Sequence, residues 1–344
     1  MKKMRKFLMV GLIVCTLFSV KAISQVKLVN KNASHEAKAL YSYIQSVAGK
    51  QILTAQHEQL YEMSQSSDSI YKITGKYPAI WGGDWGFSDE RHDIDNVKYR
   101  PKLLEEILNQ HAKGSIITMT YHQATPVTGE PCDFNPGVMG KLTPEQYKEL
   151  LTPGTKMYES WKVMIDNLAG LFKTLQEKNI PVLFRPYHET NGGWFWWSGV
   201  KGDSCSIKLY RQLYNYYTNT LKLNNLIWVW SPSDQNYFFA DYYPGAEYVD
   251  VLGLDIYPPW KKKDCTINDI FRQETYDTIL KFAQGKPITI GECSTMPTVE
   301  IFEKQPKWCW MMGWVESTLK ANSEEALIKL YNSKRVATRE DVKY

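Results

Sequence analysis

The chain has 344 residues, of which 41 are Lys or Arg and 37 are Asp or Glu, so its formal net charge is +4. Five of the positive charges lie within residues 1–24, which contain no acidic residue. Without them the balance is 36 basic against 37 acidic residues, a net charge of −1. This near-neutral balance excludes a strongly basic nucleic-acid-binding protein, and we expect no nucleic-acid partner.

Residues 1–24 predict a cleaved signal peptide. The basic start MKKMRK precedes an apolar run over residues 7–20, and Ala22-Ile23-Ser24 supplies small residues for a cut before Gln25. The apolar run is shorter than the roughly 20 residues that a membrane-spanning helix needs. We therefore expect export to the periplasm or the medium, with no membrane association after cleavage.

Eight short, almost entirely apolar runs follow, as expected for parallel strands buried on both faces. They are residues 51–57, 78–85, 115–122, 181–188, 225–231, 250–257, 286–292 and 308–314. Stretches with apolar residues three and four apart predict helices that cover a sheet. These are residues 35–48, 98–113, 157–178, 206–222, 267–284 and 323–331.

The alternation predicts an α/β fold, a (β/α)8 TIM barrel, with residues 25–344 as a single catalytic domain. An open, doubly wound sheet is the alternative. No Gly-rich phosphate loop follows the first strand, so the sequence gives a nucleotide-binding sheet no support.

Two glutamates stand at strand ends, where such barrels carry their active sites. Glu189 follows the fourth strand and Glu292 ends the seventh, which places them on opposite sides of one pocket. Glycoside hydrolysis needs such a pair, one to protonate the leaving oxygen and one to attack or to activate water. We expect Glu292 to stay ionised and Glu189 to have a raised pKa. The alternative is that each is an ordinary strand-end carboxylate in an ion pair.

Aromatic and polar residues gather at the same strand ends and are candidate substrate contacts. The loop after Glu189 contains Trp194, Phe195, Trp196 and Trp197, and aromatic planes cover the apolar faces of sugar rings. We expect Trp196 or Trp197 to fold back onto the core. The further candidates are Trp85, His122, Arg185, His188, Asp255 and Tyr257.

His188 and Glu189 are neighbours on a strand, so they cannot both face the barrel interior unless the strand end bends. The motif H-E-x-x-H is absent and no three ligands share a face, so we predict no metal. A serine nucleophile would need a G-x-S-x-G elbow, which is absent too. We also expect no cofactor.

Five cysteines remain after cleavage, in a spacing that matches no zinc pattern. A disulfide joining Cys132 or Cys205 to Cys265 is the pairing that we expect, and an odd count leaves at least one free thiol.

The segment LFRPYHETNGGWFWW at residues 183–197 resembles the acid/base segment of glycoside hydrolase family 26, which includes the β-mannanases. ITIGE, ending at Glu292, resembles the nucleophile segment of that family. VWSPS at residues 229–233 and GLDIYP at residues 253–258 resemble its fifth and sixth strands. The resemblance implies a (β/α)8 enzyme of clan A that works by double displacement with retention at the anomeric carbon.

The resemblance also assigns roles to individual residues. Glu189 matches the general acid/base and Glu292 the nucleophile. The matches to binding residues are His188, Trp194, Tyr257, Asp255, His122 on the third strand, and Trp314 as the aromatic under the cleaved sugar. The segment MMGWVES lacks the Trp-Arg pair of some members, so an Arg contact near the cleavage point is not carried over.

The leading hypothesis is an exported, monomeric β-1,4-mannanase whose partner is mannan, glucomannan or galactomannan. A β-1,3-1,4-glucanase (lichenase) and a β-1,3-xylanase of the same family are the alternatives, and a non-catalytic glycan-binding protein is an alternative of another class. The connection over residues 123–155 is far longer than usual. It predicts a wall at one end of the cleft and short products such as mannobiose.

Overall fold

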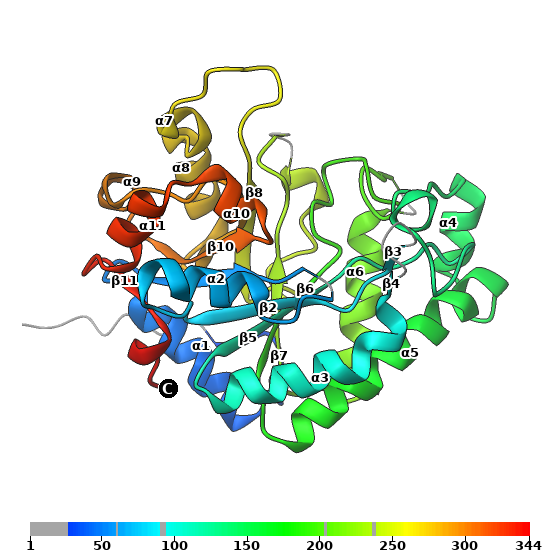
Figure 1. Cartoon of the computed structure of the whole chain (residues 1–344). Helices are drawn as coiled ribbons and strands as arrows, with labels where there is room; N and C mark the ends of the chain where they lie inside the picture. The colour runs from blue at the N-terminus through cyan, green and yellow to red at the C-terminus, as the bar shows by residue number, and fades with distance from the viewer. Residues whose placement is uncertain (1–26, 60, 90–93, 203–204, 236–238) are drawn as a thin grey trace, which may run out of the picture.

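The computed structural model describes residues 27–59, 61–89, 94–202, 205–235 and 239–344 (Figure 1). The predicted signal peptide and its cleavage site lie outside these ranges. Within them, no helix is both long and apolar enough to cross a membrane.

Eight parallel strands form a closed barrel, which confirms the predicted (β/α)8 fold (Figure 1). Each strand pairs with the next one of the barrel along the chain, and the last pairs with the first, for example Leu53 with Trp310. Each strand lies within two residues of its predicted limits. The barrel strands are β1 (Ile52–His57), β2 (Ile80–Asp84), β5 (Ile116–Tyr121), β6 (Val182–Pro186), β7 (Leu226–Trp230), β8 (Val251–Ile256), β9 (Ile288–Cys293) and β10 (Trp308–Trp314).

Most predicted helices are present around the barrel. These are α1 (His35–Val47), α3 (Asn96–Ala112), α5 (Lys156–Glu177), α6 (Ser206–Tyr214) with its continuation η3 (Asn215–Thr220), and α11 (Glu324–Tyr331). The single helix predicted over residues 267–284 is wrong: it is divided into α7 (Ile267–Ile270) and α8 (Gln273–Ala283). Phe271 between them has a non-helical backbone and is buried. Next to it, Arg272 reaches back to the carboxylate of Asp234 at 3.0 Å, and these contacts fix the break.

The sequence patterns missed the short elements. They are α2 (Gln65–Thr74), α4 (Pro144–Leu150), α9 (Val299–Lys304), α10 (Ser317–Ala321), the β3 (Ser88–Asp89) and β4 (Ile94–Asp95) pair, β11 (Val336–Ala337), η2 (Phe134–Val138), η4 (Phe239–Tyr242) and η5 (Arg339–Asp341). Elements of seven residues or fewer give too little sequence for a clear periodicity. Helix α2 is longer, but its sequence QSSDSIYKIT contains few apolar residues.

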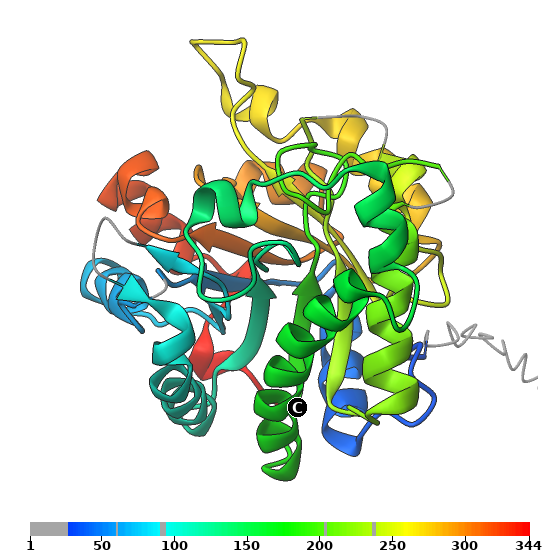
Figure 2. The same cartoon turned by 90° about the vertical axis from the view of Figure 1, so that its right-hand side faces the viewer.

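The two ends of the barrel differ. Helix α1 packs Ala37, Leu40 and Ile44 against apolar side chains of the barrel interior, including Leu53 and Ile80, and closes one end. The connections at the carboxyl ends of the strands are longer, and the one between β8 and α7 projects farthest from the barrel (Figures 1 and 2). The open end of the barrel is therefore the end that sequence patterns assigned to chemistry.

Much of the tryptophan content lies in the core. Trp196 and Trp197 are 1% and 0% exposed, so both fold back onto the core, where the sequence predicted one. The other fully buried tryptophans are Trp81, Trp85, Trp161, Trp228, Trp230 and Trp308.

The predicted disulfide is absent. Cys132, Cys205 and Cys265 are all free thiols in the described part of the chain, as are Cys293 and Cys309. Cys132 and Cys205 are buried, whereas Cys265 is partly exposed and its thiol donates to the carbonyl of Lys262.

Candidate active site

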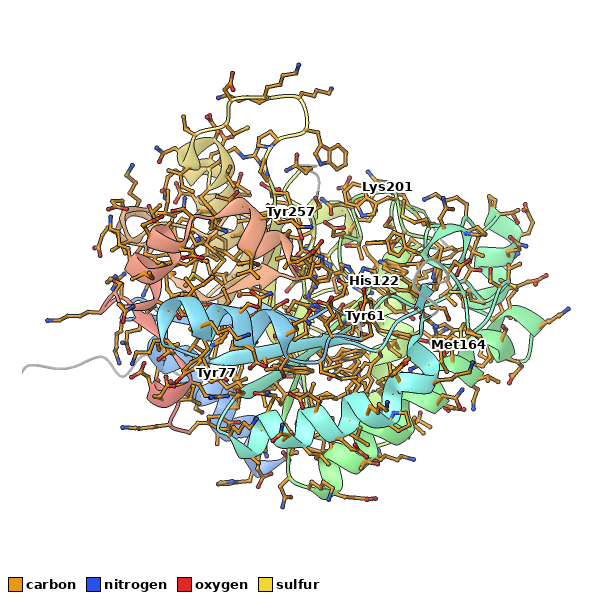
Figure 3. The ribbon with its side chains drawn as sticks, viewed as in Figure 1. Tyr61, Tyr77, His122, Met164, Lys201 and Tyr257 are labelled. Carbon is orange, nitrogen blue, oxygen red and sulfur yellow. The ribbon has the colours of Figure 1, made fainter. Side chains whose placement is uncertain are left out.

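A pocket of about 640 Å³ opens at the carboxyl ends of the strands. It brings together seven side chains that the sequence singled out: His122, His188, Glu189, Trp194, Tyr257, Glu292 and Trp314. Figure 3 shows His122 and Tyr257 in the central part of the molecule. The pocket walls also contain Phe195, from the aromatic loop after Glu189, and residues that the sequence patterns did not single out as substrate contacts: His57, Glu58, Gln59, Asp84, Phe87, Phe134, Met139, Trp260 and Val315.

The chain bends sharply where β6 ends. Tyr187 and Glu189 have φ angles of 47° and 52°, in the left-handed region that non-glycine residues rarely adopt. Successive side chains of a strand point to opposite faces, and this bend interrupts that alternation. His188 and Glu189 therefore both line the pocket, while Tyr187 is buried against Trp161. Such backbone strain costs about 1–3 kcal/mol per residue and persists only where surrounding contacts hold it. One such contact is the bond from Glu189 N to the carbonyl of Ser231 at 2.6 Å.

Glu189 has the environment of a general acid. Its side chain is almost fully buried, and burial, followed by the nearby charge of Glu292, raises its pKa to about 8. The indole Nε1–H of Trp194 donates to Glu189 Oε2 at 2.6 Å and partly offsets this rise. At neutral pH the carboxyl group is therefore protonated and can donate a proton.

Glu292 is held as a hydrogen-bond acceptor at the end of β9. The hydroxyl of Tyr257 donates to its Oε2 at 2.7 Å, and the guanidinium of Arg185 donates to its Oε1. Each carboxylate oxygen thus has a donor, which fixes its orientation toward the pocket.

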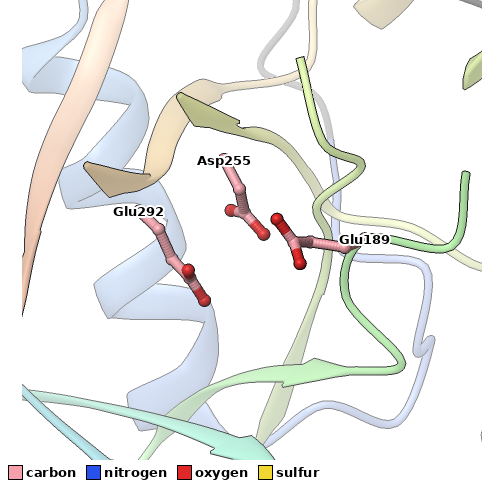
Figure 4. Close-up of side chains that lie close together, drawn as sticks. All are labelled: Glu189, Asp255 and Glu292. Atoms are coloured by element: carbon pink, nitrogen blue, oxygen red, sulfur yellow. The ribbon is translucent and has the colours of Figure 1, made fainter. Parts of the chain in front are cut away.

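Three carboxylates lie close together in Figure 4, those of Glu189, Asp255 and Glu292. One oxygen from each lies within 4.8 Å of the others, and within the described ranges these are the residues that could hold a cation. Asp255 is fully buried, and burial raises its pKa well above its usual range although Arg185 opposes the rise. Arg185 donates to Asp255 Oδ2 at 2.9 Å as well as to Glu292, so its guanidinium already pairs with two of the three.

A chain of hydrogen bonds fixes the two histidines. Asp84 accepts from Nδ1 of His122, whose Nε2 lies 3.1 Å from Nε2 of His188. The other ring nitrogen of His188 lies 3.3 Å from the hydroxyl of Thr120. Burial raises the pKa of Asp84, but its bond and attraction to His122 outweigh that effect and bring it to about 2. Burial, followed by the charge of Arg185, lowers the pKa of His188 well below its usual value, so this ring is neutral.

Trp314 forms the pocket wall on the side of Glu292. Its ring lies 5.9 Å from the guanidinium of Arg185 and 4.1 Å from the ring of His57. Trp314 is only partly buried, so one face remains open to a ligand.

Three predicted substrate contacts are corrected by the structure. Trp85 is 0% exposed and packs edge-on against Phe172 of α5, so it faces the helical layer and not the pocket. Arg185 and Asp255 are buried behind Glu292 and do not line the pocket. They position the carboxylates, because they contact Glu292 or each other instead of the open space.

The pocket thus holds one carboxyl group with a raised pKa, that of Glu189, and a second one, that of Glu292, which accepts two hydrogen bonds. Such a pair at one end of a barrel is the arrangement of a glycoside hydrolase. The family model for glycosyl hydrolase family 26 matches residues 29–341, so the chain belongs to that family, as its motifs predicted.

Two curated relatives that match this chain are named mannan endo-1,4-beta-mannosidases. The chain is 30% identical over 335 residues to the mannan endo-1,4-beta-mannosidase A and B of Caldalkalibacillus mannanilyticus, covering 92% of this chain and 63% of the relative. It is 31% identical over 268 residues to the mannan endo-1,4-beta-mannosidase of Bacillus subtilis strain 168, covering 72% of this chain and 69% of the relative. This chain thus spans less than two thirds of the first relative.

Two solved structures share the fold over nearly their whole length. GH26A from Muricauda sp. MAR_2010_75 superposes with a TM-score of 0.83 at 35% identity, covering 92% of this chain and 100% of that one. The Bacillus subtilis mannanase man26 superposes with a TM-score of 0.75 at 26% identity, covering 93% of this chain and 97% of that one.

Proposed function

We propose that residues 25–344 form an exported, monomeric, retaining β-1,4-mannanase that cleaves mannan, glucomannan or galactomannan. The observation that carries this proposal is the pair of carboxyl groups, Glu189 and Glu292, which line one pocket with oxygens within 4.8 Å of each other. The substrate class rests on relatives of the family that are named mannan endo-1,4-beta-mannosidases. The basic and apolar segment before Gln25 supports export.

The geometry favours double displacement. Retaining glycosidases hold their two carboxyl groups about 5–5.5 Å apart, whereas inverting enzymes leave room for a water molecule between them. Oxygens of Glu189 and Glu292 lie within 4.8 Å of each other, which favours direct attack on the sugar. Glu189 then protonates the glycosidic oxygen while Glu292 forms a covalent bond to the anomeric carbon.

The second step reverses the role of Glu189. The charge of Glu292 is one cause of the raised pKa of Glu189, and this charge disappears when Glu292 becomes an ester. The pKa of Glu189 therefore falls in the intermediate, so that its carboxylate takes a proton from the water that releases the sugar. Tyr257 and Arg185 keep Glu292 in place throughout, through their bonds to its two oxygens.

The long connection over residues 123–155 supports short products such as mannobiose. Phe134 and Met139 of this connection line the pocket and narrow one of its sides. A chain-end preference then yields a product profile dominated by one or two short oligosaccharides from the start of digestion. A random ladder of lengths from mannan would contradict this part of the proposal.

The test compares hydrolysis of mannan, lichenan and β-1,3-xylan by the purified mature protein, with NMR of the first-formed anomer. We expect cleavage of mannan and a β-anomer. Preferred cleavage of lichenan or β-1,3-xylan would instead assign a glucanase or a xylanase, and binding without cleavage would assign a glycan-binding protein. The amino-terminal sequence of protein recovered outside the cytoplasm, expected to begin at Gln25, tests export.

Two variants test the roles of the carboxylates. Glu189→Ala should retain activity on substrates with very good leaving groups, because their departure needs no proton donor. Azide should accelerate its second step, because this anion attacks without the general base that water needs. Glu292→Ala should lose turnover on every substrate. Equal losses in both variants without rescue by azide would refute the assignment.

A further inference from the structure

Trp260 is an exposed aromatic residue at the mouth of the active site. It is 74% exposed, a larger fraction than any other large apolar side chain in the part of the chain that the structure describes. Its connection, residues 257–266, projects beyond the barrel between β8 and α7 (Figures 1 and 2). The indole nevertheless lines the pocket that contains Glu189 and Glu292. An indole left in water at the edge of a binding pocket is suited to being covered by a ligand.

The connection holds Trp260 in place. A turn closes around it through the bond from Lys262 N to the carbonyl of Pro259 at 3.0 Å. The ammonium group of Lys262 pairs with Asp269 of α7 at 2.7 Å, which ties the turn to the helix. Pro259, directly before Trp260, has a fixed φ and further limits the freedom of the backbone. The backbone that carries the indole is thus held by its own contacts, so a ligand has little backbone left to order.

The contacts of Trp260 place it on one side of the scissile bond. Its ring centroid lies 5.4 Å from that of Trp194, at an interplanar angle of 56°. Trp194 in turn donates to Glu189, the group that protonates the oxygen of the departing sugar. Trp314, in contrast, lies beside Arg185, which donates to Glu292. The Trp194–Trp260 pair therefore faces the leaving group.

We propose that Trp260, together with Trp194, forms a binding site for a neutral sugar unit on the leaving-group side of the cleaved bond. The inference rests on the proposed glycosidase function, and it adds the direction in which the substrate chain crosses the pocket. The ligand is a pyranose of a β-linked glycan, whose apolar C–H face covers the indole. Trp260 acts in binding and has no part in proton transfer.

The experiment compares Trp260→Ala with the wild type on two substrates. Mannohexaose places sugars on both sides of the cleaved bond, whereas mannobiosyl fluoride has a single atom as its leaving group. We expect kcat/KM on mannohexaose to fall about five- to tenfold, as an aromatic contact of this kind predicts, and kcat/KM on the fluoride to stay unchanged. Cleavage of mannohexaose in ¹⁸O-labelled water should shift away from bonds with two or more sugars on the leaving-group side.

Two further variants serve as controls. Trp260→Phe keeps an aromatic face and should recover most of the lost activity. Tyr71→Ala removes a partly exposed ring of α2 that stacks on Tyr77 away from the pocket, and it should behave like the wild type. Because Trp260 is mostly exposed, its replacement should leave the thermal unfolding of the protein unchanged.

The outcomes separate the two proposals. Equal losses on the two substrates, or no loss on mannohexaose, would overturn the role of Trp260. A wild type that cleaves no mannan would overturn the mannanase assignment alone. The same pair of measurements on the oligosaccharide and glycosyl fluoride of the glycan that it does cleave would then decide the role of Trp260.

Discussion

Replacing Trp194 by phenylalanine should move the alkaline limb of kcat/KM to higher pH. The wild type needs a protonated Glu189, whose pKa is about 8, so its activity should fall as the pH rises through about 8. The bond from Trp194 Nε1 to Glu189 Oε2, 2.6 Å long, stabilises the charged carboxylate and lowers this pKa. Phenylalanine keeps an aromatic ring but removes the donor, so the protonated form becomes more favourable.

The magnitude follows from the strength of that bond. A hydrogen bond to a charged group contributes about 1.5–3 kcal/mol, and about 1.4 kcal/mol corresponds to one pH unit. Trp194 is only partly buried, so solvent replaces part of the lost interaction and the lower end applies. We expect the alkaline limb to move from about pH 8 to about pH 9.

The assay measures kcat/KM on a manno-oligosaccharide from about pH 5 to 10, with circular dichroism at each pH to verify folding. Trp260→Phe is the matched control, since it changes the neighbouring ring and leaves the Trp194 donor in place, and its limb should not move. Glu189→Ala assayed on mannobiosyl fluoride should show no alkaline limb near pH 8. A limb that stays at its wild-type position in Trp194→Phe, or moves to lower pH, would refute the reasoning.

Three further substitutions test the structure at single positions. Arg185→Met should lower the free energy of unfolding by about 3–5 kcal/mol in urea titrations, because it removes the guanidinium that pairs with two buried carboxylates. A loss below about 1 kcal/mol would contradict this. Gly192→Ala should reduce kcat/KM while the thermal midpoint changes little. The added Cβ would lie 2.2 Å from Trp194 Cζ2 and displace the indole. Unchanged kinetics would show that the indole has room to move. Gly170 lies at an exposed site of α5, where an added Cβ meets no atom within 4 Å. Gly170→Ala should therefore stabilise the protein by about 1 kcal/mol and raise Tm by about 2 °C without changing kcat. A lower Tm would count against the helical geometry there.

The sequence by itself determined the barrel and the two glutamates. The eight strands are buried on both faces and therefore appear in the sequence as short, nearly all-apolar runs, and their limits were predicted to within two residues. Glu189 directly follows one of these runs and Glu292 ends another, and the parallel arrangement of a barrel brings the ends of the strands to one rim. These conclusions depend on local patterns and on chain topology.

Only the tertiary structure decided where side chains next to these glutamates point. The left-handed backbone at Tyr187 and Glu189 turns His188 and Glu189 toward the same pocket. Neither of these two residues is a glycine, so their residue types do not predict such a bend. Trp85 is an aromatic residue at a strand end, as a substrate contact would be, but its side chain points outward from the end of β2 and packs against α5. A strand end can present a side chain to either layer, and packing selects between them.

The remaining site residues come from long-range contacts. The carboxylate of Asp84 reaches His122 from a neighbouring strand, and Phe134 and Met139 arrive from a long connection with no periodic pattern. In the sequence, Trp260 is an aromatic residue after two prolines, and this local pattern did not predict a place in the site. Its place beside Trp194 results from packing between two loops about 60 residues apart in the chain, and local sequence patterns carry no record of such contacts.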